Sequence, residues 1–123
     1  MYTVVRVTVD AAKVGELDIV GKSMNELRQG VYTGIRKAGD GFSCEVCTDE
    51  GWDRHKEAIS RFAHDFAVPL RRLVGIGASV IFDVAVEPED RKGRGRVLVL
   101  RGDVPFLYML ACDGIGLEVS IYG

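Results

Sequence analysis

The chain has 123 residues, 47% hydrophobic and 28% charged, which is the size and composition of one globular domain, and we place a single α+β domain over residues 1–123. The 16 basic and 18 acidic residues give a net charge of −2, which argues against a dedicated nucleic-acid binder, and no apolar run approaches the ~20 residues of a membrane span. Three cysteines, an odd number, and a start without the layout of a signal peptide argue against a disulfide framework and predict a cytoplasmic protein with free thiols.

The N-terminal segment from Tyr2 to Asp10 alternates apolar and polar residues. It predicts a half-buried strand with Val5, Val7 and Val9 on one face. Residues 11–22 fit a helical turn, a loop or a short strand, and the sequence leaves all three open.

A helix is predicted from Ser23 to Gly39. The sequence Ser23-Met24-Asn25-Glu26 matches a capping box, in which the serine hydroxyl and the glutamate carboxylate each satisfy a backbone N–H at a helix start. Gly30 and Gly34 weaken this helix by about 1 kcal/mol each relative to Ala. One face collects its apolar residues, which are Leu27, Val31, Ile35 and Ala38.

The middle of the chain predicts a strand, a helix and a strand. Phe42 to Cys47 alternates as a strand, and Ala78 to Glu87 does the same. Val68-Pro69 interrupts the helix between them, because a residue before proline avoids helical geometry, and a short continuation reaches Leu73. The helix itself carries a continuous apolar stripe of Trp52, His55, Ile59, Phe62 and Phe66.

The C-terminal part predicts a hairpin, a helix and a last strand. A polar turn at residues 88–95 should join the strand before it to a partner strand at Arg96–Arg101. Asp103 can cap a helix from Val104 to Cys112, with Pro105 in the first turn, where its missing N–H is not needed. The last strand ends at Tyr122, and its predicted inward residues are Leu117, Val119 and Ile121.

The motif Gly-x-Gly occurs at residues 39–41, 75–77 and 114–116, each time between a predicted helix and a predicted strand. A glycine just past a helix accepts the left-handed conformation that closes the last turn. Phosphate-binding loops run in the opposite order, from a strand through glycines to a helix N-terminus. The motif therefore predicts helix ends and not a nucleotide site.

From residue 41 onward the predicted order is βαββαβ, which is that of a ferredoxin-like plait. We therefore expect a plait over about residues 41–123, with a mostly antiparallel sheet and helices on one face. The first strand and helix would be an extension that widens the sheet.

The residues that could catalyse a reaction or bind a metal are better explained by structural roles. Cys44 and Cys47 have CxxC spacing, but in an alternating strand their sulfurs should point to opposite faces, with Cys44 in the core and Cys47 exposed or at an edge. His55 lies in the apolar stripe of its helix, which favours a packing role. Asp83 and Glu118 face outward, and the sequence places no companion near either of them. We therefore predict no catalytic residues, no metal and no cofactor.

The basic cluster near residue 94 is the strongest indication of nucleic-acid binding. Acidic residues directly before the cluster neutralise it, and the strand that follows has no aromatic residue on which an RNA base could stack. We therefore predict a solvated hairpin and no nucleic-acid partner. The cluster consists of Arg91, Lys92, Arg94 and Arg96.

The helix from Val104 to Cys112 is apolar around nearly its whole circumference, although a helix that covers a sheet needs only one apolar stripe. Two interpretations stay open. Another helix on the same sheet face buries its far side, or Leu107, Tyr108 and Cys112 leave an apolar patch for a second copy or another protein. Tyr122 adds an outward apolar residue near the end of the chain.

Residues 73–122 run from Leu73 to Val86 through the predicted hairpin to Val99-Leu100-Arg101-Gly102-Asp103, and they end from Leu110 to Tyr122 in a helix, a small-residue turn and an alternating strand that ends in Tyr. In these features the chain resembles a family of small bacterial domains of unknown function. The resemblance implies no catalytic residues, and an immunity or accessory role near toxin genes for some members.

We therefore expect a non-enzymatic protein–protein interaction domain, such as an immunity or accessory protein that binds a toxin, another protein or a second copy of itself as a homodimer. The alternative is a small-molecule-binding regulatory domain, because ligand sensors of the amino-acid-binding type share the βαββαβ order.

Overall fold

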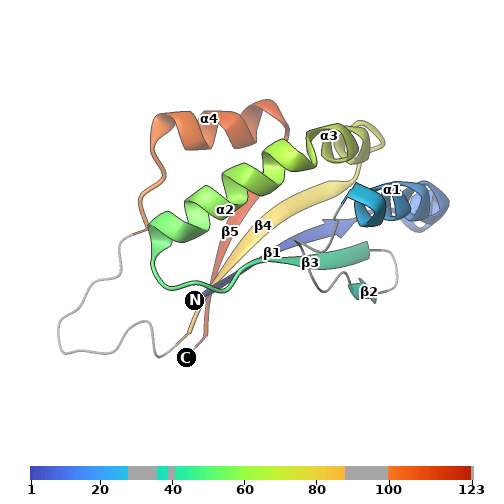
Figure 1. The fold of residues 1–123 in the computed structure, drawn as a ribbon. Helices are drawn as coiled ribbons and strands as arrows, with labels where there is room; N and C mark the ends of the chain where they lie inside the picture. Colours follow the sequence, from blue (N-terminus) through green and yellow to red (C-terminus); the bar gives the residue numbers. More distant parts are fainter. Residues whose placement is uncertain (28–35, 39–40, 88–99, 123) are drawn as a thin grey trace.

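A computed structural model describes residues 1–27, 36–38, 41–87 and 100–122, and Figure 1 shows it as a ribbon. The fold class α+β is confirmed. In chain order the elements are β1 (Tyr2–Thr8), the 3-10 helix η1 (Ala11–Lys13), α1 (Val14–Leu27), β2 (Arg36–Ala38), β3 (Gly41–Cys47), α2 (Trp52–Asp65), α3 (Ala67–Gly75), β4 (Ser79–Val86), α4 (Val104–Cys112) and β5 (Gly116–Ile121).

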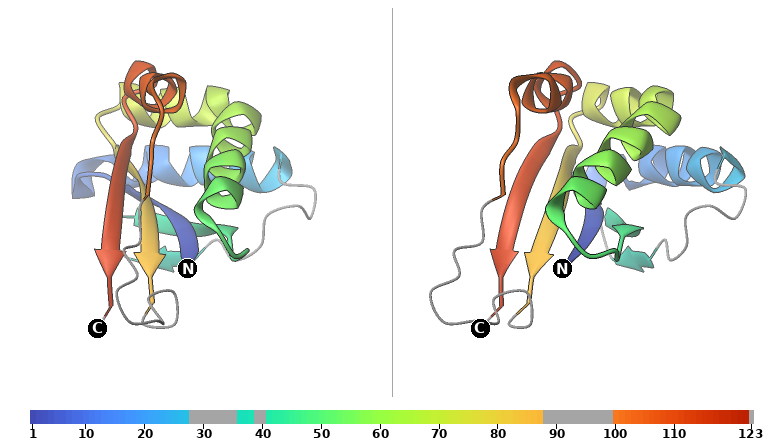
Figure 2. Two further views of the ribbon diagram at one scale, coloured as in Figure 1. Left: turned by 90° about the vertical axis from the view of Figure 1, so that its left-hand side faces the viewer. Right: turned by 60° about the vertical axis from the view of Figure 1, so that its left-hand side comes forward.

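The strands of the described residues form one mixed sheet in the order β2-β3-β1-β4-β5. All neighbours pair antiparallel except β4 and β5, which are parallel. The four α-helices lie on one face of this sheet, where residues from each of them join the hydrophobic core (Figures 1 and 2). The other face, which we call the open face, carries no helix of the described residues.

This strand order differs from that of the predicted ferredoxin-like plait. β1, expected as an extension of the sheet, is its central strand, because Val5 and Val7 are fully buried and both of its edges are paired. β4 lies between β1 and β5, so both of its edges are occupied and the predicted hairpin partner at Arg96–Arg101 is not its neighbour. Residues 96–99 lie outside the described residues, and Leu100 and Arg101 belong to no strand.

The predicted helix start at Ser23 is wrong. α1 begins at Val14, so Ser23 lies inside the helix, and residues 11–22, left open above, form η1 and most of α1. The helix position follows from a buried stripe at spacings of three and four, made of Leu17, Val20 and Met24. β2 occupies the end of the predicted helix, and residues 28–35 lie outside the described residues.

The predicted helices from Trp52 and from Val104 are confirmed. The first ends at Asp65, and the break before α3 lies at Phe66 and not at Val68-Pro69 as predicted, because Pro69 lies in the first turn of α3, where its missing N–H is not needed. The second begins as expected, because Asp103 Oδ1 accepts a hydrogen bond of 3.0 Å from the Phe106 N–H and Pro105 lies in the first turn. In the core, the Phe62 ring lies 4.6 Å from that of Phe66 and 5.8 Å from that of Phe82, measured between ring centroids.

Two of the three Gly-x-Gly motifs end helices as predicted, and residues 39–40 of the first lie outside the described residues. Gly77 and Gly114 have φ values of 87° and 66°. The following N–H groups bond back into the last helical turn, from Ala78 to the Leu73 oxygen (3.0 Å) and from Ile115 to the Leu110 oxygen (2.9 Å). Both helices therefore end in the same left-handed closing motif.

The last strand is confirmed over Gly116–Ile121, but its predicted inward face is wrong in part. Leu117 packs against the core, whereas Val119 is 43% and Ile121 66% exposed. The reason is that β5 is an edge strand, so the helices cover only its beginning.

Candidate functional site

The helix α4 is apolar on two opposite sides. Phe106 and Leu110 are buried in the core, and the Phe106 ring meets the Trp52 ring edge-on at a centroid distance of 6.1 Å. The opposite side is exposed, to 78% at Val104, 46% at Leu107 and 69% at Tyr108. Their spacing of three and four extends to two further exposed residues, so we define the α4 outer face as Val104, Leu107, Tyr108, Ala111 and Cys112.

Of the two interpretations left open for this helix, the exposed one fits the described residues, since none of them covers the far side of α4. Leu107, Tyr108 and Cys112 lie together on the α4 outer face, and a hydrogen bond with the Cys112 thiol raises the pKa of Tyr108. Tyr122 lies elsewhere, past the far end of β5. Its hydrogen bond with Tyr2 raises the pKa of the Tyr2 hydroxyl.

A groove of about 700 Å³ separates α4 from α2. Its α4 wall includes Pro105, Phe106 and Met109, and its α2 wall is charged. Part of this charge is already paired, because Lys56 Nζ lies 3.2 Å from Asp53 Oδ1. The groove lies on the side of α4 that faces α2, so it is distinct from the α4 outer face.

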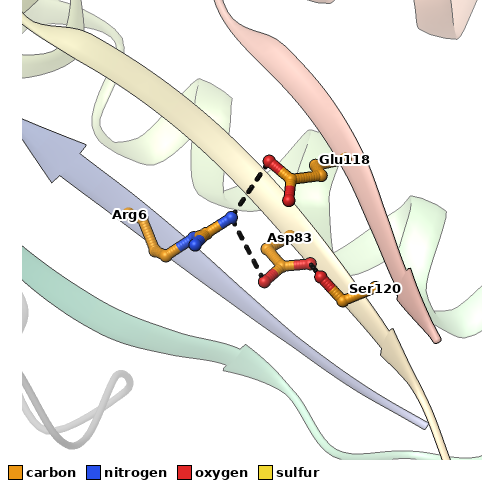
Figure 3. A network of polar contacts seen from close by, with 4 residues as sticks. All are labelled: Arg6, Asp83, Glu118 and Ser120. Carbon is orange, nitrogen blue, oxygen red and sulfur yellow. Dashed lines mark hydrogen bonds and ion pairs between the residues drawn. The ribbon is translucent and has the colours of Figure 1, made fainter. Parts of the chain in front are cut away.

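On the open face, charged side chains of three strands meet (Figure 3). Arg6 Nη2 of β1 lies 3.4 Å from Asp83 Oδ2 of β4 and 3.1 Å from Glu118 Oε2 of β5. Ser120 Oγ donates a hydrogen bond of 2.8 Å to the other Asp83 oxygen, Oδ1. The sequence predicted that Asp83 and Glu118 face outward, but not that Arg6 joins them, because their proximity depends on the pairing of β1 and β5 with β4.

This network is suited to holding strands together. The Asp83 side chain is only 9% exposed, and both of its oxygens are engaged. These contacts hold the carboxylate in place between its neighbours on β1 and β5. The network therefore ties β1, β4 and β5 together.

His55 links β1 to α2 from inside the core. The ring is fully buried, with Nδ1 2.7 Å from Thr3 Oγ1 and Nε2 2.7 Å from the Asp49 carbonyl oxygen. Because a carbonyl only accepts, Nε2 carries a proton and donates it to Asp49. Both ring nitrogens are satisfied and no groove described above includes His55, which fits the packing role favoured by the sequence.

The prediction that Cys44 and Cys47 point to opposite faces is wrong. Cys44 pairs with Val5 and Cys47 with Thr3, both on the helix-covered face of β1. The register shifts between Thr3 and Val4, so β3 contains one extra residue that restores Cys47 to the core side. Cys44 is 1% and Cys47 8% exposed, so neither thiol is at the surface.

The three thiols should react at very different rates. We expect one fast-reacting thiol per chain at about pH 7.5, that of exposed Cys112, with Cys44 and Cys47 reacting only after unfolding in denaturant. Burial raises the pKa of Cys47, so the folded chain also holds less thiolate there at neutral pH. Titration with a chromogenic disulfide reagent measures this. The Cys112→Ser variant should lose the fast phase, and a second fast thiol in the native protein would contradict the described burial.

No protein-family model, no curated protein and no solved structure matches this chain. Within residues 1–27, 36–38, 41–87 and 100–122, no helix has the length and apolar character of a membrane span. The same residues hold no group of three or more His, Cys, Asp or Glu side chains placed to bind a metal ion.

Proposed function

We propose that this protein is a non-enzymatic protein–protein interaction domain that binds its partner through the α4 outer face. The observation that carries the proposal is the exposed apolar stripe of α4, a helix without a single charged residue. Exposed apolar residues are common singly, but a contiguous patch marks an interaction site in a monomeric soluble domain.

The composition of the stripe supports the same conclusion. Tyr108 is a large amphipathic side chain of the kind that anchors interfaces. Leu107 directly precedes it, and Val104 lies one helical turn before it. Phe106 and Leu110 anchor the helix in the hydrophobic core, so a partner meets a preorganised surface.

The groups best suited to catalysis are engaged in the fold, which supports the non-enzymatic part of the proposal. His55 uses both ring nitrogens inside the core, and Asp83 uses both oxygens on the open face. The immunity or accessory role and the toxin as partner rest on the resemblance described above and stay predictions.

Tyr108→Asp should weaken association with the partner at least about tenfold, because it places a charge in the centre of an apolar contact. Since Tyr108 is 69% exposed, the monomer should keep its stability within about 0.5 kcal/mol. Sedimentation measures self-association, and binding to a purified partner measures hetero-association. Ile19→Asp is the matched control, because Ile19 is a 55% exposed apolar residue on the distant helix α1. If Tyr108→Asp and Ile19→Asp both associated as strongly as the unmodified protein does, the proposal would be contradicted.

The alternative, a small-molecule-binding regulatory domain, was based on the βαββαβ order of a plait. The observed sheet order does not provide that basis, and the groove between α2 and α4 is a feature that a ligand could use. A ligand that binds there would raise the melting temperature in a metabolite screen by mass action.

A further inference from the structure

The groove between α2 and α4 continues beyond its central part. A hollow of about 490 Å³ at the start of α2 shares Asp53 and Lys56 with it, and a hollow of about 180 Å³ near the end of α2 shares Met109. Together they form one trough, the α2–α4 trough, which follows α2 from Gly51 to His64 over ~20 Å. The trough is open to solvent, a shape that suits an extended chain better than a small molecule that needs enclosure.

The two helices that form the walls begin at the same end of the trough (Figure 1). At this first end, the Trp52 ring packs edge-on against Phe106, and Trp52 Nε1 donates a hydrogen bond of 2.8 Å to the Arg101 oxygen. At the second end, Arg71 Nε of α3 donates a hydrogen bond of 3.1 Å to Asp113 Oδ1, directly after α4. The walls are therefore held at both ends, so the trough is a preorganised part of the fold.

Ion pairs within α2 neutralise most of the charge on its wall of the trough. Lys56 Nζ lies 3.2 Å from Asp53 Oδ1. Arg54 Nη1 lies 3.8 Å from Glu57 Oε2. Arg61 also lines the trough and is exposed, and it forms no ion pair with another residue of the described ranges. Its guanidinium is therefore available to a carboxylate of a ligand.

The position of Arg61 along the trough determines where such a carboxylate would lie. Met109 lines both the central groove and the hollow beside Ala63, so it lies close to the level of Arg61 on the opposite wall. At the first end, Glu50 and Asp103 oppose Arg101, so charges of both signs are present there. The preference for a negative group is therefore confined to the second end.

The α4 wall supplies the apolar part of the trough. Pro105 is exposed and Met109 half-buried, so both side chains reach the surface of the trough. Phe106 is only 7% exposed and contributes little more than a ring edge. Methionine is unbranched and adapts its shape to different apolar side chains. Pro105 and Met109 therefore form a contact surface for one apolar side chain of a ligand.

We propose that the α2–α4 trough binds an extended segment of a partner protein in which an apolar and an acidic residue are two positions apart. Alternate residues of an extended chain point to the same side and lie ~7 Å apart. The apolar side chain then packs on Pro105 and Met109 while the carboxylate pairs with Arg61. This binding site is separate from the α4 outer face, so the inference goes beyond the proposed function and does not rest on it.

The test is an NMR titration of the isotope-labelled protein with seven-residue synthetic peptides blocked at both termini. The acidic peptide is Ser-Ser-Leu-Ser-Glu-Ser-Ser, and the basic peptide has Lys in place of Glu. We expect the acidic peptide to shift the backbone amides that line the trough and to bind about fivefold more tightly than the basic one. A third peptide with Ser in place of Leu should bind about tenfold more weakly than the acidic peptide.

Arg61→Glu should reverse the order, so that the basic peptide binds more tightly than the acidic one. Arg72→Glu is the matched control, because Arg72 is exposed on α3, lines none of the three hollows and changes the net charge equally. This variant should keep the order of the parent protein. The difference between the two peptides should also shrink at high salt.

Three outcomes overturn the proposal. The acidic peptide at ~1 mM shifts no amide of the trough, or the order of the two peptides is unchanged in Arg61→Glu. The third is loss of peptide binding in Tyr108→Asp, because Tyr108 does not line the trough and belongs to the α4 outer face. The proposed function is tested separately, by association of Tyr108→Asp with a purified partner, so either proposal can fail while the other holds.

Discussion

His55→Ala should destabilise the protein by about 3 kcal/mol in urea unfolding. The substitution removes a fully buried ring from the core and leaves the Thr3 hydroxyl and the Asp49 carbonyl without the partners described here. A buried polar group without a hydrogen bond costs about 1–3 kcal/mol, and the lost packing adds to that loss.

His64→Ala is the control for this prediction, because His64 lies on the same helix but is exposed. We expect its free energy of unfolding to stay within about 0.5 kcal/mol of the parent value. If His55→Ala kept the parent stability and instead abolished an activity, the histidine would have a chemical role and the packing interpretation would be wrong.

Asp83→Ala should have the second largest effect, a loss of about 2 kcal/mol. The carboxylate is almost buried and accepts contacts from Arg6 and from Ser120, so its removal leaves a guanidinium and a hydroxyl on the open face without that partner. The contacts span three strands, and their loss should weaken the attachment of the edge strand β5 in particular. Hydrogen exchange of the β5 amides measures this local loss, and urea unfolding measures the global one.

Glu118→Ala provides the comparison within the same network. Glu118 also contacts Arg6, but its side chain is 51% exposed, and exposed ion pairs contribute about 0–1 kcal/mol. Its effect should also shrink at high salt, because mobile ions screen exposed charges. Equal losses for Asp83→Ala and Glu118→Ala would mean that burial does not set the importance of these carboxylates.

The elements predicted correctly are those whose local chemistry and packing agree. α2 follows from a single apolar stripe of regular spacing. Every residue of this stripe after Trp52 is buried, namely His55, Ile59, Phe62 and Phe66. α4 follows from a capping aspartate and a proline in the first turn, both of which act within four residues of the helix start. Local rules suffice for such elements.

The elements missed depend on contacts distant in sequence. The capping box at Ser23 was a valid local pattern, but the burial of Leu17, Val20 and Met24 places the helix earlier. The strand order depends on pairings between residues near 5, 44 and 82, which no local pattern encodes. For the same reason the sequence placed Asp83 and Glu118 on the correct face and still did not reveal that Arg6 lies between them.

The central position of β1 has a consequence for folding during synthesis. During synthesis β1 emerges before both of its partners, which are Gly41–Cys47 on one side and Ser79–Val86 on the other, so its second edge stays open until Ser79–Val86 has also emerged. Such non-local pairing slows folding, and an unpaired hydrophobic strand is prone to aggregate. A nascent chain halted before β4 should therefore depend on chaperones, and release of the completed β4 should end that dependence.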